Sequence, residues 1–208
     1  DRWGRTRVMV LAAALFTISA LGSGLAVGPW DLIVWRVIGG LGVGAASVIA
    51  PAYIAEVSPP AIRGRLGSLQ QLAIVSGIFV ALLCDAWLAS VAGGAAEELW
   101  LGAAAWRWMF WAELIPAVLY GVLALMIPES PRYLVARGRQ EEAASVLTDV
   151  LGSRDEAQVR LGEIEQTIQA DAAAPKANLR GPRFGLLPLV WVGILLSVFQ
   201  QFVGINVI

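Results

Sequence analysis

Histidine is absent from this chain of 208 residues, and cysteine occurs once, as Cys84. Without histidine, the chain lacks the commonest metal ligand and the commonest general base of proteins. A single cysteine cannot close an internal disulfide, and no Cys-x-x-Cys or Cys/His cluster is present to hold a metal. The sequence also has no nucleophile elbow and no phosphate-binding loop. We therefore expect no metal, no cofactor and no enzymatic site.

Charged residues are scarce as well. Only 15% of the chain is Asp, Glu, Lys or Arg, and the net charge is −1. Soluble domains carry about 25% charged residues. A net charge near zero gives no reason to expect nucleic acid as a partner. What the chain does have is apolar residues, which make up 58% of it and are gathered into long runs.

Five of these apolar runs are long enough to cross a lipid bilayer, which takes about 20 residues at about 1.5 Å each. One such run could be a buried helix of a soluble protein, but five together predict an all-α integral membrane protein. The runs cover residues 8–27, 32–57, 66–89, 106–127 and 186–208. Asp1 lies inside a motif and Ile208 inside a run, so we interpret both ends as truncations.

The basic residues lie almost entirely in alternate connections between the runs. Of the 15 Lys and Arg residues, 13 fall in 1–7, 58–65 and 128–185. Connections rich in Lys and Arg face the cytoplasm. We therefore predict a multi-pass protein of the cytoplasmic membrane, with these three segments inside the cell.

The segment 128–185 is polar and differs in kind from the runs around it. Ser130 followed by Pro131 is typical of a helix start. Apolar residues at the spacing of an amphipathic helix follow at Ala143, Val146, Leu147, Val150 and Leu151. We expect a short helical cytoplasmic linker, with a disordered loop as the alternative. The domain division is then 1–127, 128–185 and 186–208.

Two charged residues lie inside predicted spans. A charge in a span is costly and is a functional candidate by default, although Arg36 could instead extend to the outer headgroups. Glu113 lies at a similar depth in the fourth run, where a carboxyl group can relay a proton or form a structural ion pair with an arginine. The face of Arg36 on the second run also carries residues that we expect to pack closely against another helix: Gly40, Gly44, Ser47 and Pro51.

Side-chain amides lie in two of the spans, at Gln70, Gln71, Gln200, Gln201 and Asn206. Amides donate and accept hydrogen bonds without charge, which suits a neutral polyhydroxylated ligand. Gln200 and Asn206 converge only if their helix is interrupted, and Gly204 is the candidate break. Interrupted helices line the ligand sites of transporters. The alternative is that the amides join neighbouring helices as packing contacts.

Charged clusters at the helix ends gather on the predicted cytoplasmic side, in residues 1–5, 56–65 and 128–132. A single exposed ion pair contributes only about 0–1 kcal/mol. Several pairs together can bias an equilibrium between two conformations. The alternative is that these charges serve only to orient the protein in the membrane.

Several motifs together resemble the sugar porter family of the major facilitator superfamily, in particular its bacterial xylose–proton symporters. They are D-R-W-G-R at 1–5, R-V-I-G-G-L-G-V-G at 36–44, W-R-W-M-F at 106–110, P-E-S-P-R-Y-L at 128–134 and Q-Q-F-V-G-I-N at 200–206. The resemblance implies a fragment with helices three to seven of a twelve-helix fold. It also implies transport of a monosaccharide by alternating access, with proton symport. A facilitated-diffusion uniporter and a transporter-like sugar sensor are the alternatives.

The resemblance further implies roles for individual residues. The positions implied to bind the sugar are Gln71, Gln200, Gln201 and Asn206. Those implied in proton coupling, or as a structural charge pair, are Arg36 and Glu113. Those implied in cytoplasmic gate salt bridges are Arg2, Arg5, Glu56, Arg63, Glu129 and Arg132. The implied partners are a monosaccharide, protons and the lipid bilayer.

Overall fold

The computed structural model describes residues 3–173 and 187–202. The chain divides into two compact units, residues 1–166 and 167–208, and each is described by itself. Within the described residues, four helical segments are long and apolar enough to cross a membrane. The prediction of an all-α integral membrane protein is therefore confirmed.

The elements follow one another as helices broken by one short hairpin. In chain order they are α1 (Arg5–Leu25), α2 (Pro29–Val57), α3 (Pro60–Ala92), β1 (Glu98–Trp100), β2 (Ala103–Ala104), α4 (Ala105–Ala112), α5 (Leu114–Met126), α6 (Pro131–Ala136), α7 (Gln140–Leu151), α8 (Arg154–Ala173) and α9 (Pro188–Phe202). α3 begins six residues before the run predicted at 66–89, because Pro60 starts the helix and its first turns carry Arg63 and Arg65. The spans are therefore longer than their apolar parts alone.

α4 and α5 are successive parts of one span of 22 residues, Ala105–Met126. Pro116 has no N–H to donate to the carbonyl of Ala112, so the helical hydrogen bonding is interrupted there. Glu113 lies at this junction, between the end of α4 and the start of α5. Glu113 therefore lies three residues before a proline, at the point where the helical hydrogen bonding of this span is interrupted.

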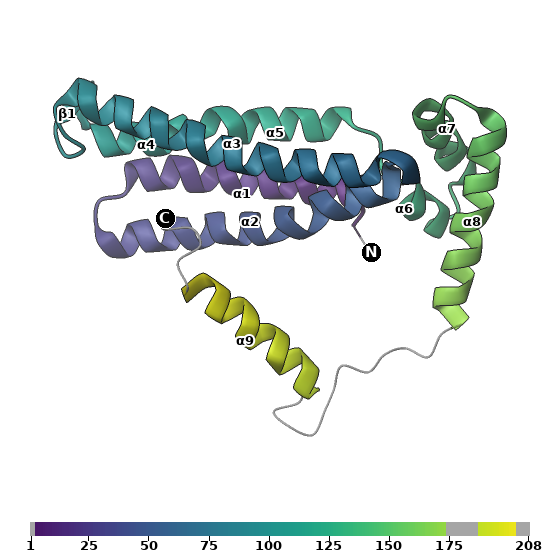
Figure 1. Ribbon diagram of the computed structural model, residues 1–208. Coiled ribbons are helices and arrows are strands. Elements are labelled where there is room, and N and C mark those ends of the chain that lie inside the picture. The colour runs from purple at the N-terminus through teal and green to yellow at the C-terminus, as the bar shows by residue number, and fades with distance from the viewer. Residues whose placement is uncertain (1–2, 174–186, 203–208) are drawn as a thin grey trace. The chain divides into compact units, whose positions relative to one another are not determined.

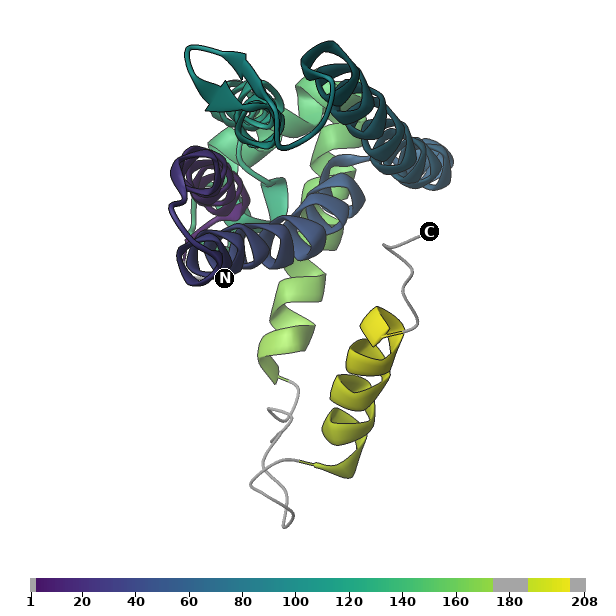
Figure 2. The same ribbon diagram turned by 90° about the vertical axis from the view of Figure 1, so that its left-hand side faces the viewer.

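α1 lies between α2 and the α4–α5 span (Figures 1 and 2). It packs against α2, α4 and α5, whereas α3 packs mainly against α4. Of the residues in the most apolar 18-residue stretch of each helix, 44% are buried in α1 but only 6% in α3. Small residues allow this close approach: Gly22 lies against the ring of Trp35 and Gly24 against Trp111, where a Cβ atom would overlap the indole.

The close-packing stripe predicted on α2 is wrong within the described residues. A Cβ atom added at Gly40 or Gly44 would have no neighbour within 4 Å. The packed face instead carries Gly39, which lies against Ser19, and Gly42, which lies against Phe16. Ser19 fixes this face by donating a hydrogen bond of 2.8 Å from its hydroxyl to a backbone carbonyl of α2. α2 therefore packs against α1 through a face that neighbours the predicted stripe and does not include it.

A two-residue turn joins β1 to β2 between α3 and α4. Leu101 and Gly102 have φ of 57° and 72°, and positive φ at both central residues is what a type I′ hairpin turn requires. Trp100 on this hairpin contacts Trp87 of α3 and Trp108 of α4, with ring centroids 6.4 and 5.3 Å apart. These aromatic contacts attach the hairpin to the ends of the two helices.

The polar segment after the fourth span forms α6, α7 and α8. Its small core consists of Leu134, Ala143, Leu147, Ala157 and Leu161. The amphipathic helix predicted from the apolar stripe is confirmed, since Ala143 and Leu147 of α7 are buried. Ser130 does precede α6, but its hydroxyl makes no capping hydrogen bond. In the second unit, α9 is an apolar helix of 15 residues.

Candidate functional site

Arg36 and Glu113 form an ion pair between α2 and the junction of α4 and α5. The Nη1 atom of Arg36 lies 3.3 Å from Oε1 and 3.2 Å from Oε2 of Glu113. The guanidinium also lies 5.1 Å from the centroid of the Phe110 ring, within cation–π range. Arg36 thus binds Glu113 across the bundle, rather than extending to the headgroups.

This ion pair is long and open to its surroundings. The side chains of Arg36 and Glu113 are 48% and 49% exposed. Both carboxylate oxygens share one nitrogen of the guanidinium, so the pair lacks the two parallel hydrogen bonds of the strongest arginine–carboxylate contacts. The pair therefore depends on one shared donor nitrogen and is only partly covered by surrounding side chains.

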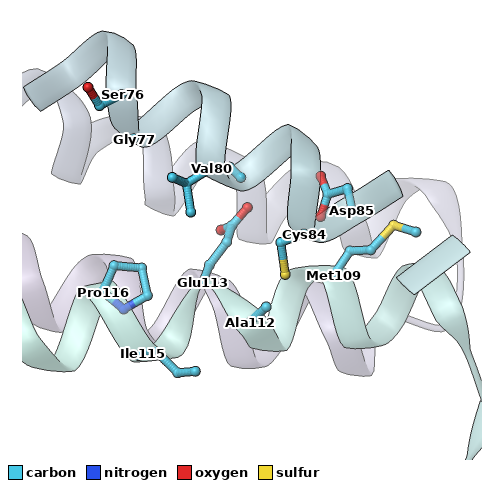
Figure 3. Close-up of a pocket in the computed structure, with 11 residues that line it drawn as sticks. Ser76, Gly77, Val80, Cys84, Asp85, Met109, Ala112, Glu113, Ile115 and Pro116 are labelled. Atoms are coloured by element: carbon cyan, nitrogen blue, oxygen red, sulfur yellow. The ribbon is translucent and has the colours of Figure 1, made fainter. Parts of the chain in front are cut away.

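A cavity of about 510 Å³ lies between α3 and the α4–α5 span, and Glu113 lines it. Figure 3 shows the Glu113 side chain rising towards α3, with Cys84 and Asp85 on the α3 side. The lining residues are Ser76, Gly77, Val80, Ala81, Cys84, Asp85, Met109, Ala112, Glu113, Ile115 and Pro116. Asp85 was not among the predicted site residues, although an acid within the third apolar run is the same signal that identified Arg36 and Glu113.

A second group of charges joins the ends of α1, α2 and α6. Arg5 binds Glu56 through two hydrogen bonds of 2.8 and 3.2 Å, and these side chains are only 18% and 13% exposed. The hydroxyl of Ser130 donates to the same carboxylate of Glu56. Tyr53, one turn earlier on α2, donates a hydrogen bond of 2.9 Å to the carbonyl of Pro128.

Glu129 completes this group by capping the N-terminus of α1. Its carboxylate accepts hydrogen bonds from the backbone N–H groups of Arg5 and Thr6, at 2.8 and 3.3 Å. It also accepts from the Thr6 hydroxyl at 2.6 Å and the Ser130 N–H at 2.9 Å. Burial alone would raise the pKa of Glu129, but these four hydrogen bonds outweigh it and lower the pKa. We call Arg5, Thr6, Glu56, Glu129 and Ser130 the rim network.

The other predicted gate residues are Arg63, Arg132 and Arg2. Arg63 donates to the carbonyl of Ser58 at 3.4 Å. Arg132 is an exposed residue in the first turn of α6. Arg2 lies outside the described residues. The structure therefore brings together Arg5, Glu56 and Glu129 from the predicted set.

The predicted sugar-binding amides are divided between the two units. Gln71 is an exposed residue of α3 in the first unit. Gln200 and Gln201 belong to α9 in the second unit, and Asn206 and Gly204 lie outside the described residues. Their convergence stays a prediction. Among residues 3–173 and 187–202, no three His, Cys, Asp or Glu side chains gather in a way that could hold a metal ion.

The family model "Sugar (and other) transporter" matches residues 1–208. A glucose transport protein from Synechocystis is 63% identical over 209 residues, which cover 100% of this chain and 44% of that protein. The D-xylose-proton symporter of Escherichia coli K12 is 38% identical over 226 residues, again with 100% and 44% coverage. The arabinose-proton symporter of Bacillus subtilis is 38% identical over 208 residues, with 100% and 43% coverage.

Solved structures of the proton:xylose symporter XylE share this fold. XylE bound to 6-bromo-6-deoxy-D-glucose matches with a TM-score of 0.81 and 36% identity, over 100% of this chain and 46% of that one. The inward open conformation of XylE from E. coli matches with a TM-score of 0.76 and 34% identity, with the same coverage. This chain spans about half the length of the relatives that it matches.

Proposed function

Since this chain belongs to the sugar transporter family of the major facilitator superfamily, we propose that it is part of a carrier that moves a monosaccharide across the cytoplasmic membrane. The carrier works by alternating access and couples sugar uptake to protons. The relatives are transporters rather than enzymes, and the described spans make this a multi-pass membrane protein.

The topology of the carrier follows from the distribution of arginine and lysine. Residues 1–127 supply helices three to six of the N-terminal half, residues 128–185 the cytoplasmic linker, and residues 186–208 the start of helix seven. Segments 1–7, 58–65 and 128–185 face the cytoplasm, because they carry most of the basic residues. The rim network then lies on the cytoplasmic side, where it holds α1, α2 and α6 together in the outward-facing conformation.

The sugar site uses uncharged amides. The residues proposed to bind the sugar are Gln71 of α3 together with Gln200, Gln201 and Asn206 of the seventh helix of the carrier. Amide groups can match the alternating donors and acceptors of sugar hydroxyls without leaving a charge unpaired in the membrane. The names of the relatives support a sugar as the ligand, since they refer to glucose, xylose and arabinose.

Proton coupling rests on the Arg36–Glu113 ion pair. A membrane-spanning carboxylate is stable while a cation neutralises it, and a proton can replace that cation. Protonation of Glu113 releases Arg36, so the two conformations of the carrier can bind the proton with different affinity. Only such a difference lets proton binding shift a conformational equilibrium.

The proposal is tested with the full-length protein in vesicles, by Glu113→Gln. Gln keeps the shape of the side chain but cannot bind a proton. We expect sugar accumulation driven by a proton gradient to fall about tenfold or more, whereas exchange of labelled for unlabelled sugar without a gradient is retained. Glu98→Gln, on the exposed hairpin, is the matched control and should leave both activities unchanged.

Three results would contradict the proposal in different ways. Accumulation that persists in Glu113→Gln would remove Glu113 from the coupling. Uptake by the unchanged protein that persists after collapse of the proton gradient would identify a uniporter. Absence of sugar uptake and sugar binding under all conditions would contradict sugar transport itself.

A further inference from the structure

Asp85 is a carboxyl group at the same level of the bundle as Glu113. It lies seven residues before the end of α3 at Ala92, which is about 10 Å along the helix axis. Glu113 lies eight residues after the start of α4 at Ala105, about 12 Å along. Because the β1–β2 hairpin connects these two helix ends, the depths are measured from the same end of the bundle.

Asp85 and Glu113 face one cavity. Both line the space of about 510 Å³ between α3 and the α4–α5 span. In Figure 3, Glu113 extends from one wall, and Asp85 lies on α3 near Met109. The remaining lining residues are uncharged, and most of them are small or apolar. The lining of the cavity therefore supplies few polar groups that could stabilise two carboxylates.

The charges around this cavity do not balance. Glu113 is paired with Arg36, whereas Asp85 has no hydrogen bond or ion pair within residues 3–173 and 187–202. The elements packed against α3 also carry Arg107 on α4, Glu98 on β1, and Asp31 and Glu56 on α2, but none of these four lines the cavity. In the part of the chain that the structure describes, one guanidinium, that of Arg36, is paired beside a cavity that two carboxyl groups line.

We propose that Asp85 binds a proton at neutral pH and is a second proton-binding residue of this carrier. If both carboxyl groups were ionised, one negative charge would stay uncompensated within a membrane-spanning segment, which is strongly unfavourable. A proton on Asp85 removes that charge, and Glu113 keeps its ion pair with Arg36. The part of Asp85 in transport rests on the proposed symport, but its protonation does not.

Cys84 allows the charge of Asp85 to be measured directly. It is the only cysteine in these 208 residues, it precedes Asp85 on α3, and it lines the same cavity. The full-length protein, with any cysteines outside these residues replaced, is treated with a cationic or an anionic methanethiosulfonate reagent. The ratio of the two reaction rates is then followed between pH 5.5 and 8.5, because the thiolate fraction affects both rates equally and cancels in the ratio.

We expect the cationic-to-anionic ratio to rise about tenfold with increasing pH. A unit charge roughly 6 Å from the sulfur in water changes the rate of a monovalent reagent about threefold, and the two reagents respond in opposite directions. Asp85→Asn should keep the ratio at its low-pH value throughout, whereas the matched control Asp31→Asn should keep the rise. Glu113→Gln should move the rise to lower pH, because Arg36 is then available to stabilise ionised Asp85.

Two results would overturn the proposal. One is a ratio in the unchanged protein that stays constant at a value above that of Asp85→Asn, which would mean that Asp85 is ionised throughout this pH range. The other is a rise that survives Asp85→Asn. The coupling part is tested by uptake: Asp85→Asn should shift the pH profile of gradient-driven sugar accumulation, and an unchanged profile would contradict it. If the protein proves to be a uniporter, the proposed symport fails, while the Cys84 ratio still decides whether Asp85 carries a proton.

Discussion

Replacing Glu56 by Gln should open the cytoplasmic rim of the carrier. Glu56 holds α1 and α6 to the end of α2, because it accepts two hydrogen bonds from Arg5 and one from Ser130. Gln keeps one acceptor oxygen but loses the negative charge. Arg5, whose side chain is only 18% exposed, then loses the negative charge of Glu56.

The size of this effect follows from the burial of the pair. Hydrogen bonds to charged groups contribute about 1.5–3 kcal/mol, and removing one partner of a fully buried pair costs more. Arg5 and Glu56 are partly open to solvent, so we take about 2 kcal/mol as the loss. This corresponds to a roughly 30-fold shift of the equilibrium towards conformations in which the rim is open.

The shift can be measured by labelling a cysteine at the rim. Ser58, which is 6% exposed, is replaced by Cys in a full-length protein without other reactive cysteines. Inside-out vesicles then expose the proposed cytoplasmic side to a membrane-impermeant thiol reagent. When opening is fast, the labelling rate follows the population of the open rim, so Glu56→Gln should increase it about 30-fold.

Glu142→Gln provides the matched control. Arg139 and Glu142 also form an arginine–glutamate pair in the segment after the fourth span, but their side chains are 52% and 56% exposed. Water screens such a pair, so its loss should change labelling at position 58 little. Equal labelling rates for Glu56→Gln and the unchanged protein would show that the rim network does not control opening, and the charges would then serve only topology.

Two further predictions concern the sugar site and the pH dependence. Gln201→Ala should weaken sugar binding to the full-length protein, measured by ligand-induced fluorescence change, by more than Phe199→Ala does, and equal affinities would assign the amide to helix packing. Glu129 has a lowered pKa, so the stabilisation from its ionised form is complete above the ordinary carboxyl pKa and is lost only as the pH falls through the lowered value. Between pH 5 and 8 the carboxylate stays ionised, and Glu129→Gln should reduce uptake without moving the midpoint of its pH profile. A moved midpoint would show that Glu129 itself titrates during transport.

The spanning helices could be predicted from the sequence because their signal is local. Each run of apolar residues carries its own evidence of length and hydropathy, which needs no knowledge of the neighbouring runs. The approach of Arg36 to Glu113 was less certain from the sequence. Arg36 and Glu113 lie at similar depths in their spans, which made an ion pair possible. Whether the two side chains face each other depends on how their helices pack around α1. An arginine at this depth could also extend to the headgroups.

Packing between helices was the part that sequence patterns predicted wrongly. Gly40 and Gly44 form as regular a small-residue stripe as Gly39 and Gly42, and nothing within α2 distinguishes them. The choice is made by α1, whose Ser19 and Phe16 lie against Gly39 and Gly42. Ser130 shows the same limit, since the sequence marks it as a helix start but its hydroxyl binds the distant Glu56 instead.

The two charged groups of the bundle differ in ways that suit different tasks. Glu129 accepts hydrogen bonds from backbone groups that cannot move away without unwinding the start of α1, and Glu56 is largely buried against Arg5. The hydrogen bonds to Glu129 lower its pKa, and both sets of contacts tie α1 to the neighbouring helices. The Arg36–Glu113 pair is longer, half exposed and beside a cavity with a second carboxyl group. We therefore expect the rim network to set the balance between conformations, whereas the proposed coupling depends on the Arg36–Glu113 pair beside the cavity.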